Sequence, residues 1–525
     1  MSDDRNMQQN VIAFLANPST HGVDHVTRID THAAHVFLAG HRALKIKQAV
    51  KYPFLDYSTL ERRKNACEQE LAINRPFAPQ IYRGVVAITR EPTGTLAVDG
   101  AGEPVEWAVD MIRFDETQTL DHLAANAPVG PALAVQIADL IASAHETAPV
   151  AVTEPWLRSI PAIIAGNTAA FRAAKLFPED AIDHLDQASN AALARLRPLL
   201  EQRGNAGFVR RCHGDLHLAN IVLIENEPVI FDAIEFDAQI ASIDVLYDLA
   251  FVLMDLLHAG STAAANSLLN RYLAQTPDAN SDSLAILPLL MSMRAAIRAN
   301  VTLARLARVD DRDGAIRRMA SGYFDLACRL IAPAPPRLVA IGGLSGTGKS
   351  VLARGLADSL APPPGAIVLR SDTTRKKLFG IEETDRLPES AYRPGHSNAV
   401  YQALTRNAER ILRQGRSVIV DAVYAREDER RAIARMARSM DVPFAGLFLV
   451  ADLDIRIARI AGRSGDASDA TPAVARQQQS YDLAGLDWNI VDSSGTPDDT
   501  LTRSRSVLSR TGNADETAIA KAPAD

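Results

Sequence analysis

Residues 213–232 contain the residue types that phosphoryl transfer requires, at a spacing that could bring them together. His213-Gly214-Asp215 is followed by Asn220, five residues after Asp215, and then by Asp232, twelve residues after Asn220. Transfer of a phosphoryl group to a hydroxyl needs a carboxylate that accepts the hydroxyl proton, and oxygen ligands for Mg²⁺. We therefore expect Asp215 to be the catalytic base, and Asn220 and Asp232 to be metal ligands. The alternative is a structural remnant without activity.

A second group of residues directly follows the apolar segment 338–342 and has the spacing of a phosphate-binding Walker A motif. Glycines allow successive backbone N–H groups to surround a β-phosphate, and the helix that follows adds a favourable field. Lys349 would reach the β and γ oxygens, and Ser350 would ligate Mg²⁺. ATP and Mg²⁺ are therefore the expected cofactors. The expected nucleotide contacts are Gly343, Ser345, Gly346, Thr347, Gly348, Lys349 and Ser350.

Carboxylates follow the next two strand-like segments, and arginines follow further along the chain. Val368-Leu369-Arg370-Ser371-Asp372 ends the second segment, and Val418-Ile419-Val420-Asp421 ends the third. Together with the arginine-bearing helix after residue 453, these segments resemble the zeta-toxin, gluconate kinase and adenylylsulfate kinase group of P-loop kinases. The resemblance covers about residues 337–495.

This resemblance implies a role for each of five side chains. Asp372 would contact or deprotonate the acceptor hydroxyl, and Arg375 would fix the substrate. Asp421 would be the carboxylate of the Mg²⁺ site, while Arg459 and Arg463 would neutralise charge that develops on the transferred group. Two structural alternatives stay open: an N-cap role for the aspartate and ordinary solvated helix positions for the arginines.

The first group, around Asp215, resembles the aminoglycoside phosphotransferase and choline kinase group of the protein-kinase-like superfamily. The resemblance implies that Lys45 pairs with the nucleotide phosphates and that Glu70 orients it. Lys47 is a possible substitute, because it lies on the same face of a period-two strand. Asp248 would support the catalytic loop together with Asp244.

Two departures from that family pattern leave alternatives open. Glu235 and Asp237 follow the metal-binding carboxylate closely, so either could share or replace the role of Asp232. A glycine-rich loop is also missing between the first strands. Residues 31–35 would then have to cover the phosphates with small side chains.

The elements that must position the first group are a sheet and a set of helices. Residues 26–51 have strand-like patterns, residues 58–77 a helical pattern, and residues 81–89 and 105–112 further strand patterns. Alanine- and leucine-rich segments then predict helices. We expect an α+β protein-kinase-like fold over residues 25–330, with a small antiparallel sheet lobe and a helical lobe.

A proline-rich segment separates this part of the chain from one in which strand and helix patterns alternate. That alternation predicts an α/β P-loop kinase with a parallel sheet. We expect a kinase-like domain at residues 1–332, a Pro-rich linker at 333–336, a P-loop kinase domain at 337–500 and a disordered tail at 501–525.

The bulk composition is that of a soluble protein with more than one domain. The chain has 525 residues and a formal charge of −7, which argues against non-specific binding to nucleic acid or anionic membranes. Its 3 cysteines have no paired spacing, which suits a reducing cytoplasm. No uncharged apolar run approaches the ~20 residues of a spanning helix. We expect a cytoplasmic protein without nucleic-acid or membrane partners.

The whole chain resembles bacterial bifunctional proteins that join an aminoglycoside phosphotransferase-like domain to an ATP-binding P-loop domain. We therefore predict an ATP- and Mg²⁺-dependent phosphotransferase in which two kinase-like domains transfer the γ-phosphate to hydroxyls of small molecules. The acceptors are unknown. The alternatives are a nucleotide-gated regulatory ATPase and a kinase-like domain that only binds a ligand.

Overall fold

A computed structural model describes residues 2–31, 33–52, 55–306, 311–383, 385–462, 467–483 and 485–519. The chain forms two compact units. The first contains residues 1–129, 136–261 and 290–327, and the second contains residues 130–135, 262–289 and 328–525. Each unit is described by itself below.

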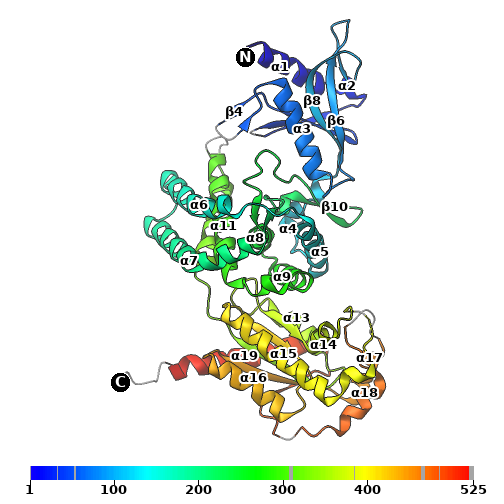
Figure 1. Ribbon diagram of the computed structural model, residues 1–525, viewed down its shortest axis with the longest axis vertical. Coiled ribbons are helices and arrows are strands. Elements are labelled where there is room, and N and C mark those ends of the chain that lie inside the picture. The colour runs from blue at the N-terminus through cyan, green and yellow to red at the C-terminus, as the bar shows by residue number, and fades with distance from the viewer. Residues whose placement is uncertain are drawn as a thin grey trace. The chain divides into compact units, whose positions relative to one another are not determined.

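The first unit begins with a six-stranded antiparallel sheet in the order β1-β2-β3-β8-β6-β7. Its strands are β1 (Val26–Asp30), β2 (Ala34–Ala39), β3 (Arg42–Lys47), β6 (Tyr82–Arg90), β7 (Leu96–Val98) and β8 (Glu103–Ile112). Helices α1 (Ser2–Ala16) and α3 (Leu60–Asn74) lie beside this sheet (Figure 1). Short elements α2 (Pro18–His21), β4 (Lys51–Tyr52) and β5 (Leu55–Asp56) complete this lobe.

The side chains of β3 alternate between an apolar face and a charged face of the sheet. Leu44 and Ile46 are buried with Val11 of α1 in one apolar cluster. Because successive side chains of a strand point to opposite faces, Lys45 and Lys47 lie on the face that α3 covers. The sequence prediction of a sheet with one inserted helix is confirmed, but helix α1 was missed.

The rest of this unit is mainly helical. It consists of α4 (Leu120–Asn126), α6 (Thr153–Ala174), α7 (Glu179–Asn205) and α8 (Val245–His258), together with most of α5 (Pro131–Thr147), α11 (Leu287–Leu306) and α12 (Ala315–Ile331). Four short strands frame the loop that carries Asp215: β9 (Val209–Arg211) paired with β12 (Ser242–Asp244), and the hairpin β10 (Ile221–Ile224) and β11 (Glu227–Ile230). The predicted kinase-like fold is confirmed.

Helix α8 is the centre of this lobe, since every side chain from Val245 to Leu256 is buried. Helix α11 is also largely buried. Residues Leu284–Leu306 are long and apolar enough to cross a membrane, but 67% of the most apolar window is buried inside the protein, as in a core helix.

The second unit contains a five-stranded parallel sheet in the order β14-β15-β13-β16-β17. The strands are β13 (Leu338–Gly343), β14 (Ile367–Arg370), β15 (Val418–Asp421), β16 (Phe444–Val450) and β17 (Asn489–Asp492). The helices are α13 (Lys349–Ala357), α14 (Ser371–Phe379), α15 (Pro394–Arg413), α16 (Glu427–Ser439), α17 (Leu453–Ala461), α18 (Pro472–Gln477) and α19 (Pro497–Ile519). The predicted α/β class is confirmed, and the carboxyl ends of the strands face one edge, where such folds bind ligands.

Helices α9 (Thr262–Gln275) and α10 (Asp278–Ser281) belong to this second unit, so the chain does not divide at residue 332 as predicted. The reason is the edge strand β14. Asn266 Nδ2 donates to the Ala366 carbonyl at 3.0 Å, and Asn270 Oδ1 accepts from the Val368 N–H at 2.8 Å. Two asparagine side chains therefore take the place of a neighbouring strand.

The predicted disorder from residue 501 onward is wrong for the part of the tail that the structure describes. Helix α19 continues to Ile519, and its Leu508 is buried in the core of the second unit with Leu501 packed beside it. Leu501 and Leu508 are seven residues apart and share one helix face, a pattern that the polar composition concealed. Residues 520–525 lie outside the described residues.

Candidate functional sites

Lys45 lies at the centre of the first site, between two carboxylates. Its Nζ is 2.8 Å from Glu70 Oε1 and 2.9 Å from Asp232 Oδ1. Strand β3 supplies the lysine and α3 supplies the glutamate, whose side chain is fully buried. The structure thus joins three residues that the sequence analysis had assigned to phosphate and metal binding.

Lys47 forms a second pair beside the first. Its Nζ is 2.6 Å from Glu70 Oε2 and 2.5 Å from Glu235 Oε1, and its side chain is 2% exposed. Burial alone would raise the pKa of Glu70, but the ammonium groups of Lys45 and Lys47 outweigh it and lower that pKa to about 2. Glu235 is held by Lys47, whereas Asp232 is nearly half exposed at 45%. This favours Asp232 as the metal ligand.

A backbone constraint also fixes the position of Asp232. Its φ is 60°, in the left-handed region that a residue with a side chain rarely adopts. Asn74, fully buried on α3, accepts from the Ala233 N–H at 2.6 Å and donates to the Ala233 carbonyl at 3.2 Å. Asn74 was missed by the sequence analysis, although it follows Glu70 by one helical turn and so shares its face of α3.

The carboxylate of Asp215 is partly open to solvent, since that side chain is 42% exposed. Asn220 Nδ2 donates to Asp215 Oδ2 at 3.2 Å, and His217 Nε2 lies 3.3 Å from the same oxygen. Burial raises the pKa of Asp215, but His217 and other cations lower it to a net value below the ordinary one. The carboxylate is therefore ionised at neutral pH, as a base must be.

Helix α8 holds this loop through two aspartates, and a third caps the helix. Asp248 accepts from the Gly214 N–H at 2.8 Å and from the His213 N–H at 3.2 Å, and Asp255 accepts from the Leu218 N–H at 3.0 Å. Asp244 caps the helix and pairs with two nitrogens of Arg203, each at 2.7 Å. The predicted supporting role of Asp244 and Asp248 agrees with these contacts. Asp255 was missed, although a carboxylate inside such an apolar helix needs a polar partner.

Two of the oxygen-bearing side chains of this site suit a hard cation. The carboxylate of Asp232 and the side-chain amide of Asn220 provide the oxygen ligands that Mg²⁺ prefers. Since Asn220 Nδ2 donates to Asp215, its amide oxygen is the atom left for a metal. The residues present therefore fit the magnesium ion that the fold implies.

The second site is built on the loop between β13 and α13. Gly343, Gly346 and Gly348 have φ values of 136°, 88° and 89°, in the region that favours glycine. A Cβ at Gly346 would lie 2.6 Å from the carbonyl oxygen of Arg456, so this glycine also allows α17 to approach closely. The buried Thr347 donates from Oγ1 to the Leu344 carbonyl at 2.8 Å and shapes the loop.

The two expected Mg²⁺ residues of this loop region contact each other directly. Ser350 Oγ donates to Asp421 Oδ2 at 2.5 Å, and Arg370 Nη2 donates to Ser350 Oγ at 3.2 Å. Lys349 Nζ donates to the Leu344 carbonyl at 3.3 Å. Parallel strands β13, β14 and β15 bring these side chains together, because Arg370 and Asp421 are register partners at the strand ends. Arg370 was missed by the sequence analysis.

Asp372 is the second residue of α14, and Arg370 rather than Asp372 occupies the N-cap position. Burial and the neighbouring Asp421 raise the pKa of Asp372 above its ordinary value. Arg375 differs from its expected role. It is buried, donates from Nη1 to the Ala391 carbonyl at 2.6 Å and stacks on the Tyr392 ring at 4.9 Å, so it holds the segment after α14 in place.

The arginines of α17 divide between two neighbours. Arg456 Nε donates to the Ser345 carbonyl at 2.8 Å, while Gln478 Oε1 accepts from the Ser345 N–H at 2.7 Å. Arg459 Nη2 donates to the Gly495 carbonyl at 2.8 Å, in the loop after β17. Arg456 is thus the arginine of this helix that contacts the phosphate-binding loop. Arg463 lies outside the described residues, so its expected role stays a prediction.

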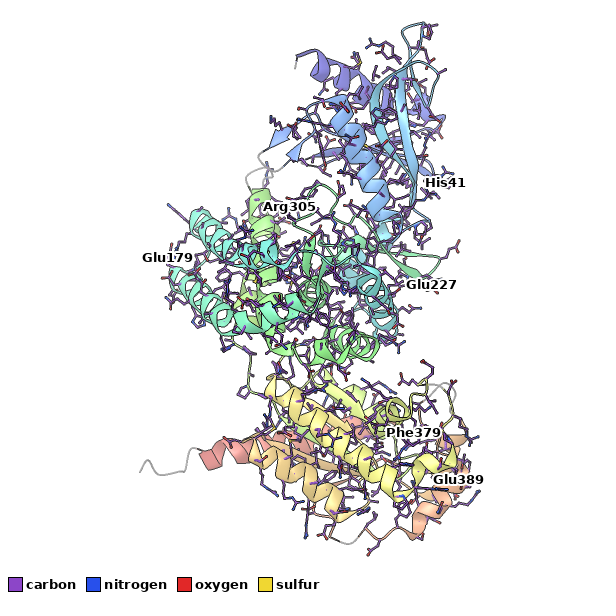
Figure 2. The ribbon with its side chains drawn as sticks, viewed as in Figure 1. His41, Glu179, Glu227, Arg305, Phe379 and Glu389 are labelled. Atoms are coloured by element: carbon purple, nitrogen blue, oxygen red, sulfur yellow. The ribbon has the colours of Figure 1, made fainter. Side chains whose placement is uncertain are left out.

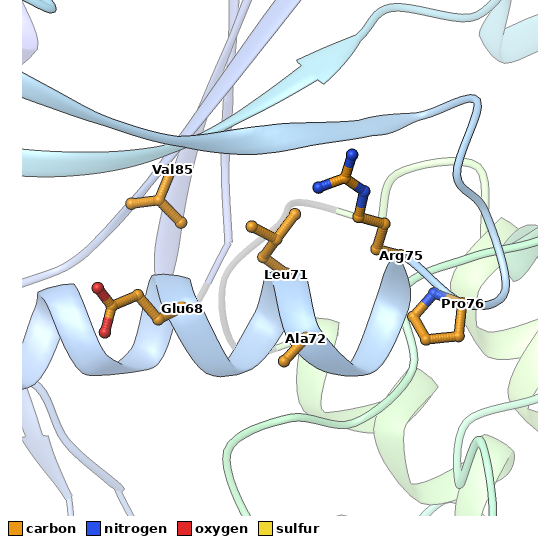
Figure 3. Close-up of a pocket in the computed structure, with 6 residues that line it drawn as sticks. All are labelled: Glu68, Leu71, Ala72, Arg75, Pro76 and Val85. Carbon is orange, nitrogen blue, oxygen red and sulfur yellow. The ribbon is translucent and has the colours of Figure 1, made fainter.

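A hollow of about 620 Å³ lies between α3 and β6 (Figure 3). Its lining is mostly apolar, with a charged side chain on either side. It is formed by Glu68, Leu71, Ala72, Arg75, Pro76 and Val85. Since it shares no residue with the groups that could bind phosphate or metal, size alone does not identify the functional site.

Comparison with known proteins gives two family matches within the chain. Residues 64–284 match the family model described as phosphotransferase enzyme family, and residues 338–483 match an AAA domain. Proteins of Mycobacterium tuberculosis and Mycobacterium bovis, both described as uncharacterized, are 31% identical over 456 residues, which is 85% of this chain and 88% of theirs. An adenylyl-sulfate kinase of Myxococcus xanthus is 33% identical over 120 residues, 22% of this chain and 59% of that protein.

Solved structures are similar to one part of the chain or the other. A choline/ethanolamine kinase family protein from Mesorhizobium loti has a TM-score of 0.38 at 17% identity and covers 62% of this chain and 95% of its own. A gluconokinase from Sinorhizobium meliloti has a TM-score of 0.26 at 18% identity and covers 36% of this chain and 98% of its own.

Proposed function

We propose two separate phosphoryl-transfer sites for this chain, which belongs to the family of proteins that join a phosphotransferase domain to a P-loop AAA domain. The chain is a kinase enzyme by these domains, with ATP as the phosphate donor. The finer proposal is that both sites are active, that both need Mg²⁺ and that both act on hydroxyls of small molecules in the cytoplasm. Nucleic acids and membranes are not among the partners we propose.

The observation that carries the proposal for the first site is the bridging position of Lys45, between Glu70 and Asp232. When bound, Mg²⁺ would neutralise phosphate charge beside Asp232 and Asn220. Lys45 would then exchange the Asp232 carboxylate for phosphate oxygens while Glu70 keeps its ammonium group in place. Asp215 would accept the proton of the attacking hydroxyl.

At the second site, the loop around Lys349 would surround the β-phosphate with backbone N–H groups. Ser350 Oγ and Asp421 Oδ2 already lie 2.5 Å apart, and these two residues would hold the Mg²⁺ that neutralises phosphate charge. Asp372, whose pKa is raised by burial and by Asp421, would be better suited to accept a proton than an ordinary aspartate. Arg459 and Arg463 remain the candidates for neutralising charge on the transferred group.

Transfer of label from γ-labelled ATP into a metabolite extract tests this function. The full-length chain is compared with Asp215→Asn and with Lys349→Ala, and labelled products are separated by chromatography. We expect each variant to lose one set of labelled small molecules and to keep the other. Release of labelled phosphate without any labelled small molecule would instead support the regulatory ATPase.

A further inference from the structure

Two arginines of α11 lie beside the loop that carries Asp215, and no step of the proposed reaction uses them. Arg294 is 6% exposed, and its Nε donates to the Tyr247 carbonyl at 3.2 Å. Its guanidinium carbon lies 3.8 Å from the centre of the Tyr247 ring and 4.4 Å from that of Phe251. Two aromatic rings of α8 therefore fix the plane of this cation.

The same face of α8 connects Arg294 to the catalytic carboxylate. The rings of Phe251 and His217 are 5.4 Å apart, and His217 Nε2 lies 3.3 Å from Asp215 Oδ2. Phe251 and His217 therefore form a continuous chain of contacts from the Arg294 guanidinium to the Asp215 carboxylate.

Arg298, one helical turn after Arg294, approaches the same loop from its other end. Its guanidinium carbon lies 5.5 Å from the centre of the Tyr323 ring. Tyr323 donates to Asp255 Oδ1 at 2.6 Å, and the other oxygen of Asp255 accepts from the Leu218 N–H. Because residues four apart share a helix face, α11 presents two guanidinium groups toward one loop.

Both arginines keep a buried donor that the protein does not satisfy. Arg294 Nη2 and Arg298 Nε are shielded from solvent and have no hydrogen-bond partner in the described part of the chain. Arg298 does interact with the Tyr323 hydroxyl, and the charges of Asp255 and Asp215 attract it, but its Nε stays unsatisfied. A buried, unsatisfied donor on a cation is unfavourable, so an acceptor that fills such a place stabilises the protein.

We infer that the phosphate acceptor of the first site carries an anionic group, a carboxylate or a phosphate, which Arg294 and Arg298 bind. This inference rests on the proposed function and names the chemical class of its substrate. The planar guanidinium matches the geometry of two oxygens of a carboxylate or phosphate. A cationic acceptor would meet two positive charges at short range in a partly dry site, which is unfavourable.

The reaction remains an ordinary phosphoryl transfer. The acceptor hydroxyl oxygen forms a bond to the γ-phosphorus, and the bond from that phosphorus to the β–γ bridging oxygen breaks. The hydroxyl proton goes to Asp215, and ADP leaves with the electron pair. The anionic group of the acceptor does not react, and its binding by the arginines orients the hydroxyl.

Equilibrium titration of the full-length chain, saturated with Mg–ADP, tests the inference with three probes: inorganic phosphate, acetate and tetramethylammonium. The variants are Arg294→Met and Arg298→Met. The matched control is Arg305→Met, on the same helix but exposed at its carboxyl end (Figure 2). We expect at least one of the two anions to bind the parent and the control equally, and both variants to bind it about tenfold more weakly, as for loss of a charge-assisted hydrogen bond.

The relative response to phosphate and acetate distinguishes the two anionic classes. Equal anion binding in all four proteins, or tighter binding of tetramethylammonium than of either anion, would overturn the inference. If Arg294→Met does not fold, anion binding by Arg298→Met and by the charge-preserving Arg294→Lys is compared with that of the parent instead. If anions bind and the arginine variants weaken that binding, but Asp215→Asn does not change label transfer, the proposed function is contradicted and this inference is not. If the protein transfers the γ-phosphate to a cationic acceptor and binds neither anion, this inference is contradicted and the proposed function is not.

Discussion

Single residues of the first site act mainly by holding one another in place. Glu70 contacts both Lys45 and Lys47, and these lysines in turn hold Asp232 and Glu235. The four contacts join five charged groups, of which Glu70 and Lys47 are almost completely shielded from water. Removing one member would leave a buried charge without its partner, which costs more than the pair contributes.

The depressed pKa of Glu70 predicts a stability difference that depends on pH. Its pKa is about 2 in the folded protein against an ordinary value of 4.5. The stabilisation is therefore complete above pH 4.5 and is lost as the pH falls from there toward 2. Chemical denaturation of the full-length protein at a series of pH values should show this loss of unfolding free energy in the parent and not in Glu70→Gln. Equal slopes of unfolding free energy against pH in the two proteins would contradict the assignment.

Asn74 should affect metal binding without contacting the metal. Asn74→Ala removes both hydrogen bonds to Ala233 and so releases the left-handed conformation of Asp232. We expect the dissociation constant of Mn²⁺ in the presence of nucleotide to rise about tenfold. Glu68→Ala, on an exposed position of the same helix, is the matched control. If Asn74→Ala lowers stability but leaves the Mn²⁺ dissociation constant unchanged, the residue has only a structural role.

At the scale of elements, each site depends on a helix that approaches a loop. Helix α3 fixes Lys45 through Glu70 and the Asp232 segment through Asn74, while α8 fixes the Asp215 loop. In the second unit, α17 approaches the phosphate-binding loop so closely that only glycine fits at position 346.

Gly346→Ala and Gly355→Ala give a matched pair for testing that approach. An alanine Cβ at position 346 would meet the backbone of Arg456 at 2.6 Å, and the φ of 88° is unfavourable for alanine. At position 355, inside α13, the nearest atoms lie at an ordinary 3.5 Å. We expect Gly346→Ala to lose nucleotide binding at the second site and Gly355→Ala to keep it, measured by calorimetry. Similar affinities in both would show that the close approach is not required.

Motif residues could be predicted from the sequence, because their types and spacing carry the chemistry locally. In the first site, Asp215 contacts Asn220, and Lys45 contacts both Asp232 and Glu70. In the second site, Ser350 of the loop contacts Asp421. Contacts between distant segments could not be predicted in the same way. Arg456 contacts the loop instead of Arg459, which no local pattern distinguishes, because all arginines of an amphipathic helix look alike in sequence.

At the scale of the whole molecule, the boundary between the units was the least predictable feature. Proline composition marked residues 333–336, yet α9 contributes Asn266 and Asn270 to the edge strand of the second unit. Hydrogen bonds across such a distance in sequence depend on tertiary structure. The family match over most of the chain applies to both units together.

Nucleotide-binding stoichiometry tests most directly the claim that this chain has two separate sites. Equilibrium dialysis of the full-length protein with a labelled, non-hydrolysable ATP analogue and Mg²⁺ should give two molecules bound per chain. Lys45→Ala and Lys349→Ala should each bind one, and the double variant none. One molecule per chain in the parent, or loss of both molecules in either single variant, would contradict the account.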